Sequence, residues 1–281
     1  MDYENIPKEI EKEIPFIAKD IIKNNNNLPY ENKKRFLNNP DSVYEHDPKW
    51  HQWGIITHSK KFRQKYDRDV NNYLKKWGLK EKVDNYLEDK IDGIKKSELI
   101  RISMPLHDIG KFHKKLIKNN SGFGYDFKNH DKISRDIILK RNLRKNLEQK
   151  GLNKNHIEYI AKCAGNHFEL GFIREKGKKS SLGYTIEFSK SKDFYDVVNS
   201  HLKYFRDFET EIGLLFLADS LSKTDVFIPG KTDKELEKNS LKAKKEINKR
   251  GLNKNLINAA KQKPVNVSVA KEYLKIVFSN K

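Results

Sequence analysis

The sequence contains very little cysteine and no long apolar run. Cys163 is the single cysteine among 281 residues, which excludes an intramolecular disulfide framework and a cysteine-rich zinc site. No apolar run approaches the roughly 20 residues of a membrane-spanning helix, and the N-terminus is acidic and interrupted by prolines. We therefore expect a cytoplasmic protein without a membrane partner, in which histidine and carboxylate side chains hold any metal.

Positive charge, in contrast, is abundant. The chain has 58 Lys and Arg residues against 39 Asp and Glu residues, a formal charge of +19. Such an excess favours polyanionic partners through counterion release. An AT-rich genome that fills surfaces with Lys and Asn, as in the NNNN run at 24–27, would give the same excess. The basic residues are spread along the chain, so a basic rim around a phosphate site and a nucleic-acid-binding face are both open.

Helical periodicity dominates the sequence and predicts an all-α helical bundle. We expect an N-terminal helical arm over 1–45, a central domain over 46–225 and a basic helical appendage over 226–281, which begins near Pro229-Gly230. Within the appendage, four residues at helical spacing predict one amphipathic helix. They are Leu236, Ser240, Ala243 and Ile247.

Only the stretch 170–194 departs from helical periodicity. Two short β-prone runs flank a tip rich in Gly, Lys and Ser, which predicts a small β-hairpin or an ordered loop. Its basic side chains would let it cover a phosphate site, although a solvated loop is an equal alternative. The candidate substrate-binding residues here are Arg174, Lys178 and Lys179.

Polar residues occupy positions in several helical patterns where core residues are expected. His58 lies at helical spacing from Ile55 and Phe62, and Asp219 lies in the apolar stretch EIGLLFLADSL. A single buried histidine is common, but several histidines and carboxylates buried together need pairing or a cation. Imidazole and carboxylate donors suit Mn, Fe, Ni, Co or Zn. The predicted metal ligands are His58, His107, Asp108, His130, His167 and Asp219.

The order H, HD, H, H, D, with the second step written PLHDIGK, resembles the HD superfamily of metal-dependent phosphohydrolases. The segments HDPKWHQWGIITHS and FLADSLSKTD are similar to the family's first-ligand approach and its terminal Ala-Asp helix. The resemblance covers about 46–225 and implies a five-helix core with one or two divalent transition metals. It also implies hydrolysis of a phosphorylated substrate, a nucleotide or nucleic acid, by metal-activated water.

Residue by residue, the resemblance implies a first metal site made of His58, His107, Asp108 and Asp219. Asp108 would bridge to a second metal, with His130 and His167 as its further ligands. Lys111 resembles the lysine of the HDxGK motif and would act with Asp108 in catalysis by neutralising phosphate charge; an ordinary surface lysine is its alternative. His51, in the approach segment, would orient a ligand or touch substrate.

Some positions depart from the family's pattern. Asn166-His167 stands where the binuclear branch often has two histidines, so one or two metals remain open. Pro105, two residues before His107, predicts a kink or a helix start. The remaining histidines His46, His156 and His201 are expected at the surface.

Other functions remain as alternatives to phosphohydrolysis of a nucleotide. They are a nuclease of the HD type acting on single-stranded nucleic acid, a di-iron oxygenase on an HD scaffold, and a non-catalytic nucleic-acid-binding module. The sequence names no protein partner.

Overall fold

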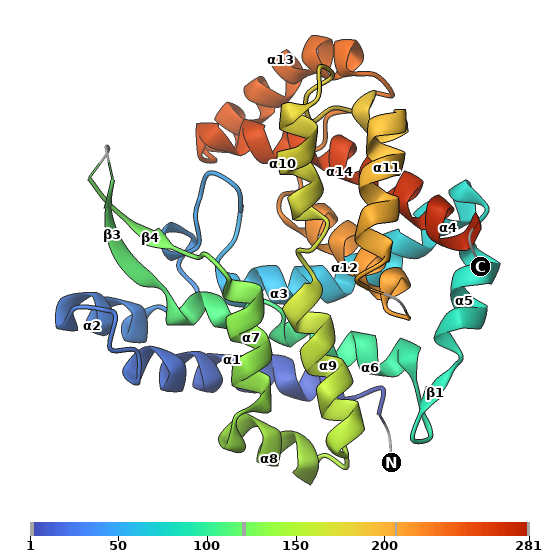
Figure 1. The fold of residues 1–281 in the computed structure, drawn as a ribbon. Helices are drawn as coiled ribbons and strands as arrows, with labels where there is room; N and C mark the ends of the chain where they lie inside the picture. The colour runs from blue at the N-terminus through green and yellow to red at the C-terminus, as the bar shows by residue number, and fades with distance from the viewer. Residues whose placement is uncertain (1–2, 120–121, 206, 280–281) are drawn as a thin grey trace. The chain divides into compact units, whose positions relative to one another are not determined.

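The computed structural model describes residues 3–119, 122–205 and 207–279, and these residues are predominantly helical (Figure 1). The all-α prediction is confirmed. The chain forms two compact units, and the predicted domain boundaries at 45 and 225 stay a prediction. Unit 1 comprises residues 1–47, 53–63 and 87–166, and unit 2 comprises residues 48–52, 64–86 and 167–281.

Unit 1 holds most of the first half of the chain. Residues 55–63 of α3 (Ile55–Lys65) belong to it. Its other elements are α1 (Ile6–Lys23), α2 (Tyr30–Asn38), η1 (Val43–Glu45), β1 (Lys90–Ile91), β2 (Ile94–Lys95), α6 (Lys96–Ser103), η3 (Met104–Leu106), η4 (Ile109–His113), β3 (Lys115–Asn119), β4 (Gly122–Asp126), α7 (His130–Leu139), α8 (Arg141–Gln149) and α9 (Lys154–Asn166).

The core of unit 1 forms where α1 and α9 pack around α6, η3, η4 and α7. One stripe of α1 is buried because apolar residues recur every four positions, at Ile6, Ile10, Ile14, Ala18 and Ile22. This stripe faces α6 and the two short helices η3 and η4. Helices α7 and α9 lie side by side on η4 and α6, respectively (Figure 1).

The helix before His107 ends as Pro105 predicts. The α-helix α6 stops at Ser103, and the chain continues through the 3-10 helix η3, in which Pro105 lies near the start. Proline has no backbone N–H and is therefore favoured in the first turn of a helix, where that N–H has no partner within the helix. Asp108 then adopts a non-helical backbone, φ −107° and ψ 8°, between η3 and η4. These changes of direction place His107 and Asp108 inside unit 1.

Both hairpins of the described chain lie outside 170–194, so of the hairpin or ordered loop predicted there, the ordered loop is present. The antiparallel pair β1 and β2 turns at Asp92-Gly93, and β3 pairs with β4 from Lys115↔Asp126 to Asn119↔Gly122. The β-prone run after Leu170 instead forms α10 (Gly171–Lys179). Residues 180–191 form the ordered loop that was the alternative, with the 3-10 turn η5 (Phe188–Lys190) inside it.

Unit 2 is built around α12 (Glu209–Ser222), which is buried on every side along most of its length and packs on α14 (Ile257–Ser279). The other elements of unit 2 are η2 (Tyr66–Val70), α4 (Asn71–Trp77), α5 (Lys80–Leu87), α11 (Lys192–Leu202), α13 (Asp233–Lys249) and η6 (Lys254–Leu256), in addition to α10 and η5.

No helix among the described residues is both long enough and apolar enough to cross a membrane.

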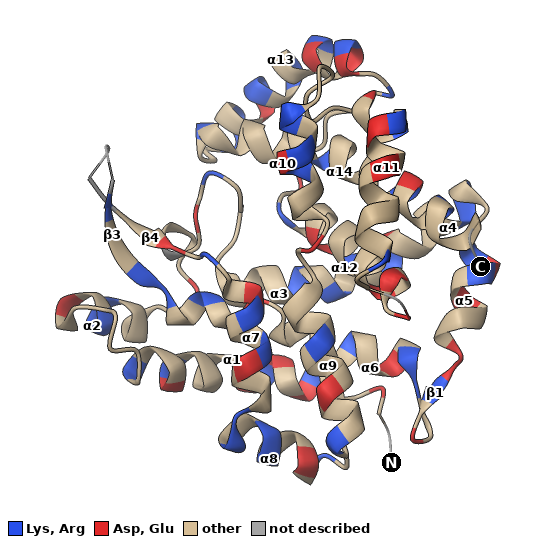
Figure 2. Ribbon diagram, in the orientation of Figure 1, with Lys and Arg blue, Asp and Glu red and all other residues tan. Residues whose placement is uncertain are grey.

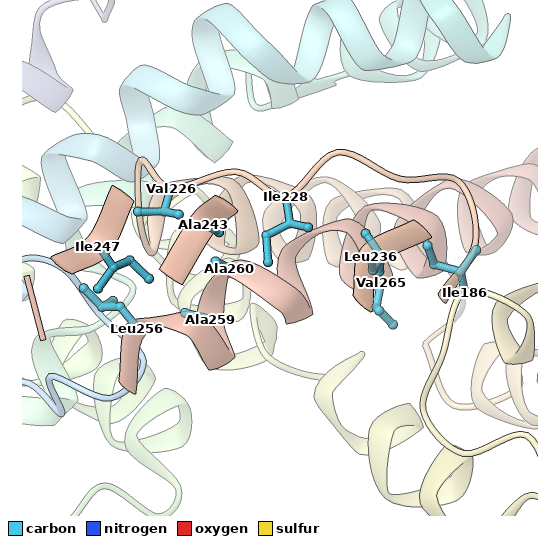
Figure 3. Packing of buried hydrophobic residues seen from close by; sticks show 10 residues of the cluster. All are labelled: Ile186, Val226, Ile228, Leu236, Ala243, Ile247, Leu256, Ala259, Ala260 and Val265. Atoms are coloured by element: carbon cyan, nitrogen blue, oxygen red, sulfur yellow. The ribbon is translucent and has the colours of Figure 1, made fainter. Parts of the chain in front are cut away.

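The amphipathic helix predicted in the basic appendage is present as α13. Its four predicted inward residues are all buried, and three of them, Leu236, Ala243 and Ile247, belong to a cluster that also includes Val226, Ile228 and Ala260 (Figure 3). Its outer face carries Lys and Glu. Figure 2 shows basic and acidic residues mixed on most helices of each unit, rather than basic residues gathered on one element.

Candidate metal centre

Asp108 is the centre of a buried group of histidines in unit 1. Its Oδ2 atom lies 3.3 Å from His107 Nε2, 3.5 Å from His58 Nε2 and 3.6 Å from His46 Nε2. Its Oδ1 atom lies 3.3 Å from His130 Nε2. The first three histidines are fully buried, and the side chain of His130 is 14% exposed. Four imidazole nitrogens therefore face one carboxylate.

The histidines reach Asp108 from segments that are far apart in sequence. His58 is on the buried face of α3, one turn before Phe62, whose ring lies 4.3 Å from the ring of His107. His130 is the first residue of α7. The inward orientation predicted for His58, for the pair His107-Asp108 and for His130 is confirmed by their burial.

Gly110 sets how closely η4 approaches α7. Its backbone N–H donates to Ser134 Oγ at 2.8 Å, and Ser134 Oγ donates to the carbonyl of His130 at 2.9 Å. A Cβ atom at position 110 would lie 2.1 Å from that carbonyl oxygen. Only glycine therefore allows Asp108 and His130 to approach as they do.

Backbone carbonyls determine which nitrogen of each ring faces the carboxylate. Nδ1 of His107 lies 2.7 Å from the carbonyl oxygen of Met104, and Nδ1 of His130 lies 2.9 Å from that of Phe127. A carbonyl oxygen only accepts, so each Nδ1 carries the proton and donates it. The Nε2 atom of each ring is then left on the side of Asp108, which is how metal-binding histidines are usually oriented.

His156 shows what a structural histidine looks like in the same unit. It is also buried, but its Nε2–H donates to the carbonyl of Ile91 at 2.8 Å, while its Nδ1 accepts from the backbone N–H of Asn153 at 3.1 Å. Both ring nitrogens thus bond to backbone groups. In His107 and His130 the second nitrogen faces a carboxylate instead, and a cation or a proton between them would relieve the repulsion of lone pairs.

Lys111 is buried beside Asp108 and is not a surface lysine. Its Nζ donates to Asp108 Oδ2 at 2.7 Å and to His46 Nε2 at 3.2 Å. Burial, followed by the charge of Lys111, lowers the pKa of His46 to about 3. Burial alone would raise the pKa of Asp108, but the neighbouring His107 and Lys111 hold it well below its usual range. The carboxylate is therefore ionised and His46 is neutral at neutral pH.

The surface prediction for three histidines is wrong. His46 is fully buried because Nδ1–H donates to the carbonyl of Trp53 at 3.0 Å and Nε2 accepts from Lys111. His156 is buried as described above. His201 is half-buried against the ring of Phe205, with centroids 4.5 Å apart, and burial lowers its pKa to about 4.

The donor set of unit 1 fits a divalent metal. Three Nε2 atoms, from His58, His107 and His130, and the ionised carboxylate of Asp108 offer the nitrogen and oxygen donors that first-row transition metals take. The rings of His107 and His130 are already oriented by the backbone, so little ordering remains for binding. His46 differs, since its Nε2 accepts from Lys111.

The other two predicted ligands belong to unit 2, and their predicted burial is confirmed. His167 is 2% exposed and Asp219 is 3% exposed. Asp219 Oδ2 lies 2.9 Å from Lys223 Nζ, and that amine lies 5.5 Å from the ring of Phe168, the residue after His167. Asp219 and the residue after His167 therefore both lie close to the Lys223 amine. The role of His167 and Asp219 as metal ligands stays a prediction.

The predicted substrate-binding residues are also in unit 2. His51 is buried, in the segment 48–52. On α10, Arg174 is half-buried and Lys178 and Lys179 are exposed, with Lys178 Nζ 2.9 Å from Glu175 Oε1. Their contact with substrate stays a prediction, as does contact of the Lys111 amine with phosphate.

The comparison with protein families covers part of this centre. The family model of the HD domain matches residues 68–224, more than half of the chain. The chain belongs to the HD-domain family. The HD match includes His107 and Asp108 but begins after His46 and His58. It is the structure that places these two histidines beside Asp108. HD membership implies metal-dependent hydrolase chemistry, and the buried His and Asp groups suggest divalent metal binding. No curated protein matches this HD chain.

Proposed function

We propose that this HD protein is a metal-dependent phosphohydrolase, a phosphodiesterase or phosphatase, that acts on a phosphoester in a nucleotide or nucleic acid. The observation that carries the proposal is the convergence of His58, His107 and His130 on the ionised Asp108, with backbone carbonyls orienting two of the rings. Structural histidines such as His156 have both nitrogens bonded to backbone groups instead.

A bound divalent cation would lower the pKa of a coordinated water toward neutrality and polarise a phosphoryl oxygen. His58, His107, Asp108 and His130 would hold it, and the family resemblance adds His167 and Asp219 from unit 2. The number of bound ions, one or two, depends on how many of these six residues coordinate metal. Mn, Fe, Ni, Co and Zn all suit the donors.

The chain's own residues prepare the centre for this chemistry. Lys111 keeps Asp108 ionised by donating to its Oδ2 atom, so the carboxylate needs no deprotonation before it binds a cation. The carbonyls of Met104 and Phe127 keep the rings of His107 and His130 from rotating. Burial of these groups excludes bulk water and strengthens electrostatic interactions with a charged phosphoester.

The substrate class follows from charge and from the family. A formal charge of +19 favours a polyanionic substrate, and HD membership suggests a phosphoester. We propose that His51, Arg174, Lys178 and Lys179 contact this substrate. In that role Lys178 exchanges its bond with Glu175 for a phosphate oxygen.

The test is hydrolysis of bis-p-nitrophenyl phosphate by metal-stripped protein refilled separately with Mn, Fe, Ni, Co and Zn. Activity should return with at least one metal and be absent in Asp108→Ala. His107→Ala should lose metal and activity, whereas His156→Ala, which removes an equally buried histidine bonded to a backbone carbonyl, should keep both at matched stability.

Each negative result has a distinct meaning. Equal loss of metal in His107→Ala and His156→Ala would show that the histidines act only through folding, and the proposal would fail. Metal bound by the wild-type protein, without turnover of this ester or of any nucleotide or nucleic acid, would favour the oxygenase or binding-module alternatives. Turnover confined to single-stranded nucleic acid would identify the nuclease.

A further inference from the structure

A second hollow in unit 1 lies apart from the residues that face Asp108. It has a volume of about 680 Å³ and is lined by α1, by His113 at the end of η4, and by the junction of α7 and α8. Pockets of roughly 300–1,000 Å³ are typical of small-molecule sites. We call it the α1–α8 cavity.

Part of the lining of the α1–α8 cavity is apolar and includes an exposed aromatic ring. The apolar lining residues are Ile17 and Ile21 of α1 and Ile137 and Leu143 of the α7–α8 segment. Phe16 also lines the cavity and is 74% exposed. An exposed ring at the mouth of a pocket offers a surface on which a planar group stacks.

The lining of the cavity also includes basic residues. Lys140 and Arg141 line it where α8 begins, and His113 at the end of η4 lines it as well. Of the side chains that the structure describes, none caps the first turn of this nine-residue helix, and no acidic residue occupies that turn. Free N–H groups and the positive end of the helix dipole favour a phosphate at such a turn.

Polar acceptors in the lining supply an independent indication of a ligand. Asn146 lines the cavity, and its side-chain oxygen Oδ1 is buried without a hydrogen-bond partner among the described residues. A buried acceptor without a partner destabilises the protein, and a donor on a ligand would relieve this cost. Asp20, whose Oδ1 accepts from Asn24 Nδ2 at 3.1 Å, adds a carboxylate suited to hydroxyl donors.

We propose that the α1–α8 cavity is a second binding site, separate from the metal centre, for a nucleoside monophosphate. The base stacks on Phe16 and donates an N–H to Asn146 Oδ1. The phosphate binds Arg141, Lys140 and the first turn of α8, and the ribose hydroxyls donate to Asp20. A free phosphate lacks the stacking group, and a nucleoside lacks the anion, so neither uses the whole cavity.

The experiment is calorimetric titration of metal-stripped protein with AMP, GMP, CMP and UMP, and separately with adenosine and inorganic phosphate. At least one nucleotide should bind in a 1:1 ratio, at least about tenfold tighter than phosphate or adenosine, since a charged hydrogen bond contributes roughly 1.5–3 kcal/mol. Arg141→Glu and Phe16→Ala should each weaken binding about tenfold or more. Both positions are exposed, so neither substitution disturbs the core.

Lys145→Glu is the matched control, because it reverses one charge at an exposed position of the same helix outside the cavity lining. It should leave affinity within about twofold, which separates direct contact from a general loss of positive charge. Asp108→Ala should also keep the affinity, so that failure of the proposed hydrolase function does not affect this result. Absence of binding by all four nucleotides at millimolar concentration, or binding lost in Asp108→Ala but retained in Arg141→Glu and Phe16→Ala, would overturn the proposal.

Discussion

Lys111 donates a hydrogen bond from Nζ to Oδ2 of Asp108 at 2.7 Å, and the side chains of the two residues are at most 9% exposed. The two residues are three positions apart, at the junction of η3 and η4. The amine also donates to His46, so one cation holds together a carboxylate and a neutral imidazole. Four experiments on this neighbourhood and on unit 2 follow from the structure.

Lys111→Met should destabilise the protein by about 3 kcal/mol, because removal of one partner leaves a buried carboxylate without its cation. Equilibrium unfolding in urea measures this loss. A divalent metal would supply positive charge to the same carboxylate, so the loss should be smaller when metal is present than after chelation. An equal loss in both conditions would contradict the assignment of Asp108 as a metal ligand.

His46→Leu should lower kcat for bis-p-nitrophenyl phosphate about tenfold while metal content and KM stay close to the wild-type values. His46 acts through Lys111, whose amine loses one of its two acceptors in this variant. Metal analysis of the purified variant, beside the kinetics, tests the assignment. Loss of the metal would instead make His46 a ligand.

Gly110→Ala should destabilise unit 1 by roughly 3 kcal/mol and lower activity, since overpacking at a close contact forces backbone shifts. The added methyl group would lie 2.1 Å from the carbonyl of His130 and would separate η4 from α7. Gly78→Ala is the control: φ is 69° there and a Cβ meets nothing within 4 Å, so strain of about 1 kcal/mol and normal activity are expected. Equal effects of the two variants on activity would refute a specific role of Gly110.

Lys263 should make stability depend on pH above neutrality. It is buried on α14, where its amine donates to the carbonyl of Thr224, and burial lowers its pKa from 10.5 to about 8. Between pH 8 and 10.5 the unfolded chain therefore binds more protons than the folded chain, so this group's contribution to stability rises with pH.

The comparison protein is Lys263→Met, which lacks the amine. The free energy of unfolding of the wild-type protein, minus that of the variant, should increase by up to roughly 3 kcal/mol between pH 8 and 10.5 and be flat from pH 6 to 7.5. Chemical denaturation at each pH gives this difference. A difference that falls or stays constant above pH 8 would show that the amine is not buried as a cation below that pH.

Helical spacing was sufficient to predict the orientation of the metal-centre residues. His58, His107 and His130 lie at such spacing from apolar neighbours, and a stripe that buries those neighbours buries the histidines as well. His46 lies between α2 and α3, where the only helix that the structure describes is the short η1. No helical periodicity there indicated whether the His46 side chain points into the core or toward solvent. Its bonds to Trp53 and Lys111 show that its side chain points inward.

The positions of the hairpins have a local and a tertiary cause. Asp92-Gly93 forms a two-residue hairpin turn, with φ of 44° and 92°, and the Asp-Gly pair is itself a sequence signal for such a turn. The β-prone run at 170–175 became helical because tertiary contacts outweigh weak strand propensity. Gly171 and Gly177 give α10 a face that approaches Phe168 and Phe188 closely, which bulkier residues would prevent.

The burial of α1 against η3 and η4 has a consequence for synthesis of the chain. Eighty residues, 24–103, separate the end of α1 from the first residue of η3. On the ribosome, α1 and the neighbouring α2 therefore emerge long before η3 and η4, and the part of the isoleucine stripe that these two short helices cover stays exposed during that interval. Contacts between such distant segments form slowly, and exposed apolar helices are prone to association. Unit 1 should thus depend on chaperones during synthesis more than its predominantly local helices would suggest.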